Sequence, residues 1–107
     1  MTLLMAKSED TVDSMCISIT KTDDREQAAF YDFSASVWRP TPNAKERQKK
    51  VGTAVGALKI DKQTGDVTLL TPMPGDVDGR RFAASRHVLT KHFRNGDFPD
   101  TTMFASG

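Results

Sequence analysis

The chain has 107 residues, of which 37% are hydrophobic and 27% charged, so it has room for one compact domain with a modest core. Its 15 Lys and Arg against 14 Asp and Glu give a net charge of +1, which excludes a strongly basic, histone-like protein. The single cysteine, Cys16, excludes an internal disulfide framework and a cysteine-based zinc or iron–sulfur site within one chain.

No segment has the length or composition of a membrane span or a secretory signal. The longest weakly polar run, residues 51–58, is far shorter than the about 20 residues that a spanning helix needs. At the N-terminus only residues 3–6 are apolar before charged residues appear, which is too few for a signal peptide. We therefore expect a cytoplasmic protein without a membrane partner.

The first half of the sequence predicts two strands. Residues 1–14 have no apolar period, so we expect a flexible leader, followed by a single domain over residues 15–107. Met15–Thr20 alternates apolar and polar residues, as a half-buried strand does. After a polar turn, Ala29–Arg39 alternates again and predicts a second strand that ends at Pro40.

Two further strands follow a polar, basic loop over residues 43–50. Val51–Asp61 is the third predicted strand, and its glycines, Gly52 and Gly56, suggest a bulge. A turn ending at Gly65 leads into the fourth strand, Asp66–Thr71. Because successive strands usually lie side by side, we expect a four-stranded antiparallel meander.

One helix is expected after the sheet, from Gly79 to Arg94. Asp76 or Asp78 can cap its N-terminus, and Asn95–Gly96 is typical of a C-terminal cap. Its apolar stripe, which should pack on the sheet, consists of Phe82, Leu89 and Phe93. The apolar residues within 97–107 could dock part of that segment as a latch. The expected fold is α+β, a four-stranded antiparallel meander sheet covered by one C-terminal amphipathic helix.

The predicted helix carries an unusual concentration of basic residues. Between Gly79 and Gly96 there are seven basic or histidine residues and no carboxylate: Arg80, Arg81, Arg86, His87, Lys91, His92 and Arg94. On a helical wheel, Arg80, His87, Lys91 and Arg94 fall within about 60° of one another, opposite the apolar stripe. This face could bind phosphates or an acidic protein surface, or it could be a solvated face whose C-terminal cations favour the helix dipole. We expect it to bind a partner, with Arg86 and Trp38 as further anchors.

A second basic group surrounds the predicted loop: Arg39, Lys45, Arg47, Lys49 and Lys50. With Phe30 and Trp38 nearby, this group has the composition of a single-strand nucleic-acid platform, in which bases stack on aromatic rings. The alternative is that Trp38 closes the edge of the core and the lysines keep the loop soluble. Nucleic-acid binding through Lys45, Arg47, Lys49, Lys50 and the basic helix is therefore the second function that we consider.

Charge is unevenly divided along the chain. Residues 1–33 contain 3 basic and 7 acidic residues, whereas residues 34–107 contain 12 basic and 7 acidic ones. If the acidic turn at residues 23–26 lies far from the helix, the molecule is a dipole that could orient a partner. The chain could also form a homodimer, since a four-stranded sheet has two free edges through which a second copy can pair.

The sequence does not predict an enzyme, a metal site or a cofactor. Cys16 with a histidine could form a nucleophile–base pair, but a lone strand cysteine is more often a small hydrophobic residue. His87 and His92 are five residues apart, which points them away from each other on a helix. Asp76–Gly79 lacks the later ligands of a calcium loop. We expect a small non-catalytic protein of the inhibitor or immunity type, which binds a macromolecular partner, most simply a protein, and modulates it.

Overall fold

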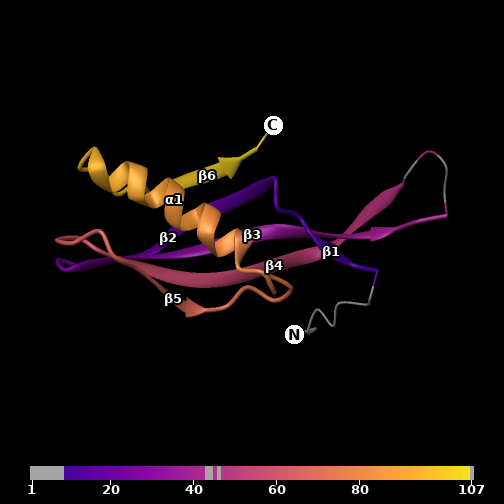
Figure 1. The fold of residues 1–107 in the computed structure, drawn as a ribbon, viewed down its shortest axis with the longest axis horizontal. Coiled ribbons are helices and arrows are strands. Elements are labelled where there is room, and N and C mark those ends of the chain that lie inside the picture. The colour runs from indigo at the N-terminus through magenta and orange to yellow at the C-terminus, as the bar shows by residue number, and fades with distance from the viewer. Residues whose placement is uncertain (1–8, 43–44, 46, 107) are drawn as a thin grey trace.

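The computed structural model of the protein describes residues 9–42, 45 and 47–106. The elements follow one another as β1 (Thr11–Val12), β2 (Cys16–Asp24), β3 (Ala28–Pro40), β4 (Gln48–Asp61), β5 (Val67–Thr71), α1 (Arg80–Arg94) and β6 (Thr101–Ala105). The molecule is elongated, with extents of 50 × 30 × 22 Å. Figure 1 shows α1 lying along one face of a long, twisted sheet.

The sheet is antiparallel throughout the described part of the chain, with the strand order β5-β4-β3-β2-β6, and β1 pairs with β3 beside this path. The expected meander is β2 to β5. The expected number of four strands was wrong, because β6 adds to the free edge of β2 and β1 pairs with the end of β3. Both added strands are short, and each is held by a strand edge that the meander leaves open rather than by a strong pattern of its own.

Part of the expected leader belongs to the sheet. Thr11 pairs with Trp38 and Val12 with Val37, so two residues of the expected leader form the strand β1 beside β3. Residues 1–8 of that leader lie outside the described residues.

The central strand β3 has the alternation that the sequence predicts. Every second residue from Ala29 to Val37 is buried, and the residues between them are half-buried. The buried side chains face α1, where Leu89 is 2% exposed and the Phe82 ring lies 6.1 Å from the ring of Phe33. The predicted apolar stripe of the helix is therefore the surface that covers the sheet.

The two glycines of β4 have different roles. The pairing of β3 with β4 shifts between Val37 and Trp38, next to Gly52, which agrees with the suggested bulge. Gly56 instead lies under an aromatic ring, since a Cβ atom built on it would be 2.5 Å from Phe33 Cζ. The sheet can therefore accommodate the Phe33 ring only where β4 has no side chain.

The hairpin of β3 and β4 extends beyond the other strands. β4 begins at Gln48 rather than at Val51, so the last residues of the expected loop belong to the strand. Thr41 donates its N–H to the carbonyl of Arg47 at 3.0 Å, which closes the described base of the turn. In Figure 1 this arm forms the right-hand end of the molecule, whereas α1 covers the left half.

Candidate functional site

The N-terminus of α1 is fixed by a polar network centred on Asp76 and Arg81. The Asp76 carboxylate accepts hydrogen bonds from the backbone N–H groups of Arg81 at 3.0 Å and Phe82 at 3.1 Å. Its side chain is only 4% exposed and also lies 3.6 Å from the Arg81 guanidinium. Asp76 thus satisfies two of the free N–H groups of the first turn, although Gly79 is the residue at the cap position.

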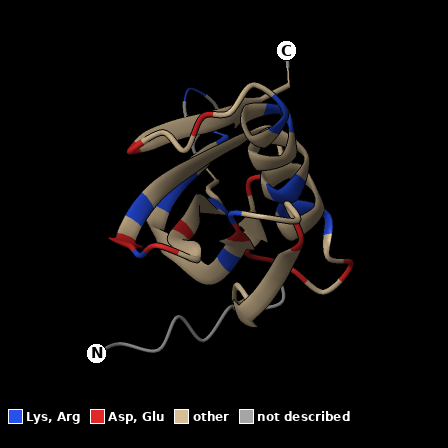
Figure 2. Cartoon of the chain, turned by 90° about the vertical axis from the view of Figure 1, so that its left-hand side faces the viewer, with Lys and Arg blue, Asp and Glu red and all other residues tan. Residues whose placement is uncertain are grey.

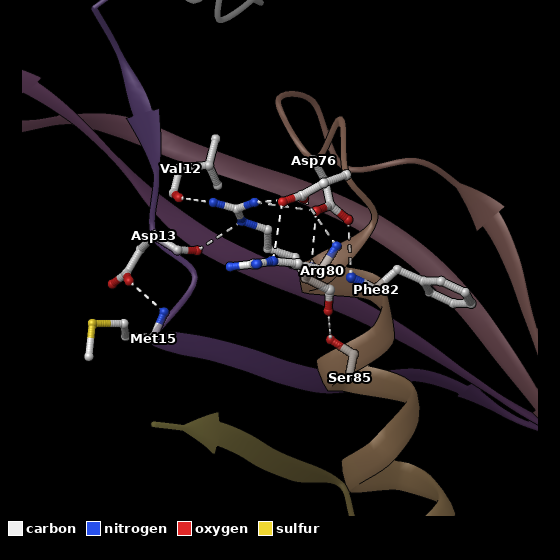
Figure 3. A network of polar contacts seen from close by, with 9 residues as sticks. Val12, Asp13, Met15, Asp76, Arg80, Phe82 and Ser85 are labelled. Carbon is white, nitrogen blue, oxygen red and sulfur yellow. Dashed lines mark hydrogen bonds and ion pairs between the residues drawn. The ribbon is translucent and has the colours of Figure 1, made fainter. Parts of the chain in front are cut away.

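Arg81 connects this network to the beginning of the chain. Its guanidinium donates hydrogen bonds to the backbone carbonyls of Val12 and Asp13. Figure 3 shows Val12 and Asp13 beside Asp76 in this network. The guanidinium also lies 3.1 Å from an oxygen of Asp78. Arg81 thus contacts two carboxylates and two backbone carbonyls. Asp76 and Asp78 both pair with Arg81, and Asp78 also pairs with Arg80, so the two carboxylates neutralise the arginines at this end of α1.

The C-terminus of α1 ends in a Schellman motif. Gly96, with a φ of 71°, donates its N–H to the Phe93 carbonyl, and Asp97 donates its N–H to the His92 carbonyl, both at 2.9 Å. The His92 ring then joins the helix to β6, because Nδ1 lies 3.0 Å from Asp97 Oδ2 and Nε2 lies 3.2 Å from Thr102 Oγ1. The predicted cap at Asn95–Gly96 is confirmed.

The exposed face of α1 carries the residues singled out in the sequence: Arg80, Arg86, His87, Lys91 and Arg94. Figure 2 shows basic segments along the helix. Arg80 pairs with Asp78 at 3.4 Å. Arg86 lies over the Phe82 ring at 5.8 Å. Within the described residues, no carboxylate forms an ion pair with His87, Lys91 or Arg94. The unpaired positive charge therefore lies in the C-terminal half of α1.

A groove of about 410 Å³ lies beside this charge, between α1 and β6. His87, Val88 and Lys91 line it from the helix, and Met103 and Phe104 line it from the strand. Sequence reasoning did not find this groove, because β6 was not expected to join the sheet. The apolar residues within 97–107 were the only signal in the sequence for that wall.

Trp38 is not part of the surface formed by α1. It lines a hollow of about 450 Å³ together with Ser18, Ser36 and Lys50, on the sheet face that points away from the helix. A second hollow places the same ring beside Arg47. Trp38 does not belong to the core, and it is separated from the basic helix face by the sheet.

The second basic group occupies the hairpin arm and not the helix. Lys45, Arg47, Lys49 and Lys50 are exposed on the described part of this arm. Arg39 differs from them, because its guanidinium contacts both carboxylate oxygens of the buried Asp10, at 2.8 and 3.0 Å. The fold thus keeps the two predicted basic groups in separate regions along the long axis.

The acidic turn between β2 and β3 is neutralised locally. Lys62 and Lys21 both contact the Asp24 carboxylate, and Arg25 pairs with Asp23 at 2.8 Å. The hydrogen bond from the Lys62 ammonium, followed by the charge of Lys21, lowers the pKa of Asp24 below its ordinary value. The contrast in charge between the two halves of the sequence is therefore reduced at this turn.

The groups considered for catalysis lie apart. Cys16 lines the hollow on the open face of the sheet, whereas His87 and His92 line the groove on the helix side. Among the described residues, no group of three or more His, Cys, Asp or Glu side chains could hold a metal ion. A search of the same residues finds no helix that is long and apolar enough to cross a membrane.

Comparisons with known proteins give no relative from which a role could be transferred. No family model matches the chain. No curated protein and no solved structure matches it either. The function must therefore be argued from the surfaces themselves.

Proposed function

We propose that this protein is a non-catalytic binding module that docks the C-terminal half of α1 on an acidic surface of a protein partner and modulates that partner. The observation that carries the proposal is that Lys91 and Arg94, on a helix fixed at both ends, have no ion-pair partner among the described residues. A rigid, positively charged face loses little conformational entropy on binding and attracts acidic partners at long range.

The test is capture of partners from a host lysate by the tagged protein, with and without nuclease treatment. We expect a discrete protein to be retained after nuclease. The double variant Lys91→Glu, Arg94→Glu should weaken its binding by at least about tenfold, because charge reversal replaces attraction by repulsion. The matched control is Lys49→Glu, Lys50→Glu, which changes the net charge equally but lies on the hairpin arm. If the helix variant binds as the wild type does, the assignment of the surface is wrong.

A second function, binding of single-stranded nucleic acid, is favoured by the hollows around Trp38. Trp38 lines one hollow with Arg47 and another with Lys50, so a base could stack on its ring while the cations contact phosphates. For this function the roles of the two double variants are exchanged: Lys49→Glu, Lys50→Glu should abolish binding. The affinity should also fall with salt by about one log–log unit per phosphate contact.

A further inference from the structure

The outer edge of the sheet at β6 is bracketed by two backbone hydrogen bonds. Lys21 donates its N–H to the carbonyl of Asp100 at 2.8 Å, and Ser106 donates its N–H to the carbonyl of Met15 at 2.8 Å. Both bonds join residues that are directly opposite each other in the register of β2 with β6. The residue pairs at the two ends of this ladder are therefore of the hydrogen-bonded kind.

Counting inward from these ends gives the direction of every backbone group in β6. In an antiparallel ladder, hydrogen-bonded pairs alternate with pairs that share no bonds. The N–H and C=O groups of Thr102 and Phe104 therefore face β2, whereas those of Thr101, Met103 and Ala105 point away from the sheet. In the described part of the chain, no other strand pairs with this edge.

The groove described above runs along that same edge. A strand added beside β6 would direct alternate side chains into the groove, because side chains alternate between the two faces of a strand. There they would meet Val88 and Phe104, which are apolar, Lys91, which is cationic, and the imidazole of His87. Among the lining residues given for this groove there is no carboxylate, and Asp97, just after α1, already lies 3.0 Å from Nδ1 of His92.

From these observations we propose that the edge of β6 and the groove beside α1 receive an extended, acidic segment of the partner protein as an added antiparallel strand. This inference rests on the proposed function and specifies the form of the partner. Backbone pairing with Met103 and Ala105 would contribute affinity, and the cations of α1 would select acidic side chains.

Other occupants fit this edge less well. A second copy pairing through β6 would place both helices on the same face across a two-fold axis, which brings the two sets of cations together. A nucleic acid has no backbone N–H and C=O groups in strand spacing to match those of β6. An acidic polypeptide satisfies both the backbone groups and the charge.

The test uses an eight-residue synthetic peptide of alternating Glu and Val, added to the full chain and followed by NMR. We expect amide hydrogen exchange of Met103 and Ala105 to slow by at least about tenfold when the peptide is present. The same peptide with Lys in place of Glu should not bind. No binding of the acidic peptide at about 1 mM, or shifts centred on Trp38, would overturn the proposal. Protection of Met103 that rises with protein concentration alone would identify a second copy as the occupant and overturn it as well.

Two variants at one position separate backbone pairing from side-chain contact. Met103→Pro removes an N–H that points outward and makes no bond within the sheet, and proline is tolerated on edge strands. It should abolish peptide binding, whereas Met103→Ala, which keeps the N–H, should retain most of it. An unchanged thermal midpoint shows that Met103→Pro is folded. If that variant does not fold, the same peptide with N-methylated amides replaces it and should fail to bind.

The two proposals fail in distinguishable ways when the captured partner is used. Loss of binding with Lys91→Glu, Arg94→Glu but not with Met103→Pro would leave the proposed function standing and reject strand addition. Full binding by both variants would reject both.

Discussion

The hydroxyl of Tyr31, in the first half of β3, donates a hydrogen bond of 2.8 Å to the backbone carbonyl of Pro99, in the segment that leads from α1 to β6. Tyr31 is fully buried. The bond therefore attaches the segment between α1 and β6 directly to the central strand, β3. Any change that weakens it should first loosen the groove beside α1.

Replacing Tyr31 by Phe tests this anchor. We expect the free energy of unfolding to fall by about 1 kcal/mol, because a net hydrogen bond is lost while the ring is kept. Urea denaturation measures this loss, and faster amide exchange in β6 would locate it. Thr68→Val, which removes an exposed hydroxyl on β5, should change stability by less than about 0.5 kcal/mol. Equal effects of the two variants would argue against a specific role for the Pro99 contact.

The buried hydroxyl of Tyr31 should also make the stability of the protein depend on pH. Burial, followed by the charges of Asp24, Asp97 and Asp100, raises the pKa of Tyr31 from 10.0 to about 12. Because the folded state binds this proton more tightly, the contribution of Tyr31 to stability is complete below pH 10 and is lost as the pH rises through about 12.

Tyr31 is the only tyrosine in the chain, so the absorbance of tyrosinate reports on it alone. In the native protein its titration should be shifted toward pH 12, and in urea its midpoint should return to about 10. A native midpoint at the ordinary value would contradict the burial of the hydroxyl.

In the network at the start of α1, the buried carboxylate of Asp76 should contribute more to the free energy of unfolding than the more exposed carboxylate of Asp78. Asp76→Ala leaves two N–H groups of the first turn and the Arg81 guanidinium without their buried carboxylate, and should cost about 3 kcal/mol. Asp78→Ala removes a more exposed carboxylate and should cost less than Asp76→Ala. Chemical denaturation of both variants gives the comparison, and the reverse order would show that Asp76 is not the principal cap.

The close approach of Gly56 to Phe33 predicts a steric conflict with a rescue. Gly56→Ala places a methyl group within 2.5 Å of the Phe33 ring and 2.9 Å of Met73 N, and should cost about 1–3 kcal/mol. Phe33→Leu in the same chain relieves the ring contact, so the double variant should lose less than the sum of the two single losses. Additive losses in this double-mutant cycle would mean that the ring is not what excludes a side chain from position 56.

Much of the fold could be predicted because strong local patterns decide it. The alternation in Ala29–Arg39 reappears in β3, and the expected helix Gly79–Arg94 differs from α1 by one residue at its start. The sequence of Thr101–Ala105 does not alternate apolar and polar residues, although the exposure of these residues alternates in the folded strand. Its position is decided by the open edge of β2, distant in sequence, which no local reading can reveal.

In the candidate site, too, some features follow from local sequence patterns and others depend on how the strands are arranged. The exposure of His87 and Lys91 follows from the helical period, and both are exposed. The separation of Trp38 from those cations depends on which sheet face carries the helix, and the groove depends on β6. Neither could be obtained before the strands were placed.

The pairing of β2 with β6 also bears on how the chain acquires its structure. In the sequence, β2 and β6 are separated by the other strands of the meander and by α1. Such non-local closure is slow, and until it happens the edge of β2 is open to pairing with other chains. Lengthening the segment between α1 and β6 should therefore slow refolding and increase aggregation at high protein concentration, with only a small loss of equilibrium stability. By covering the edge of β2, β6 is thus a safeguard against aggregation as well as one wall of the groove.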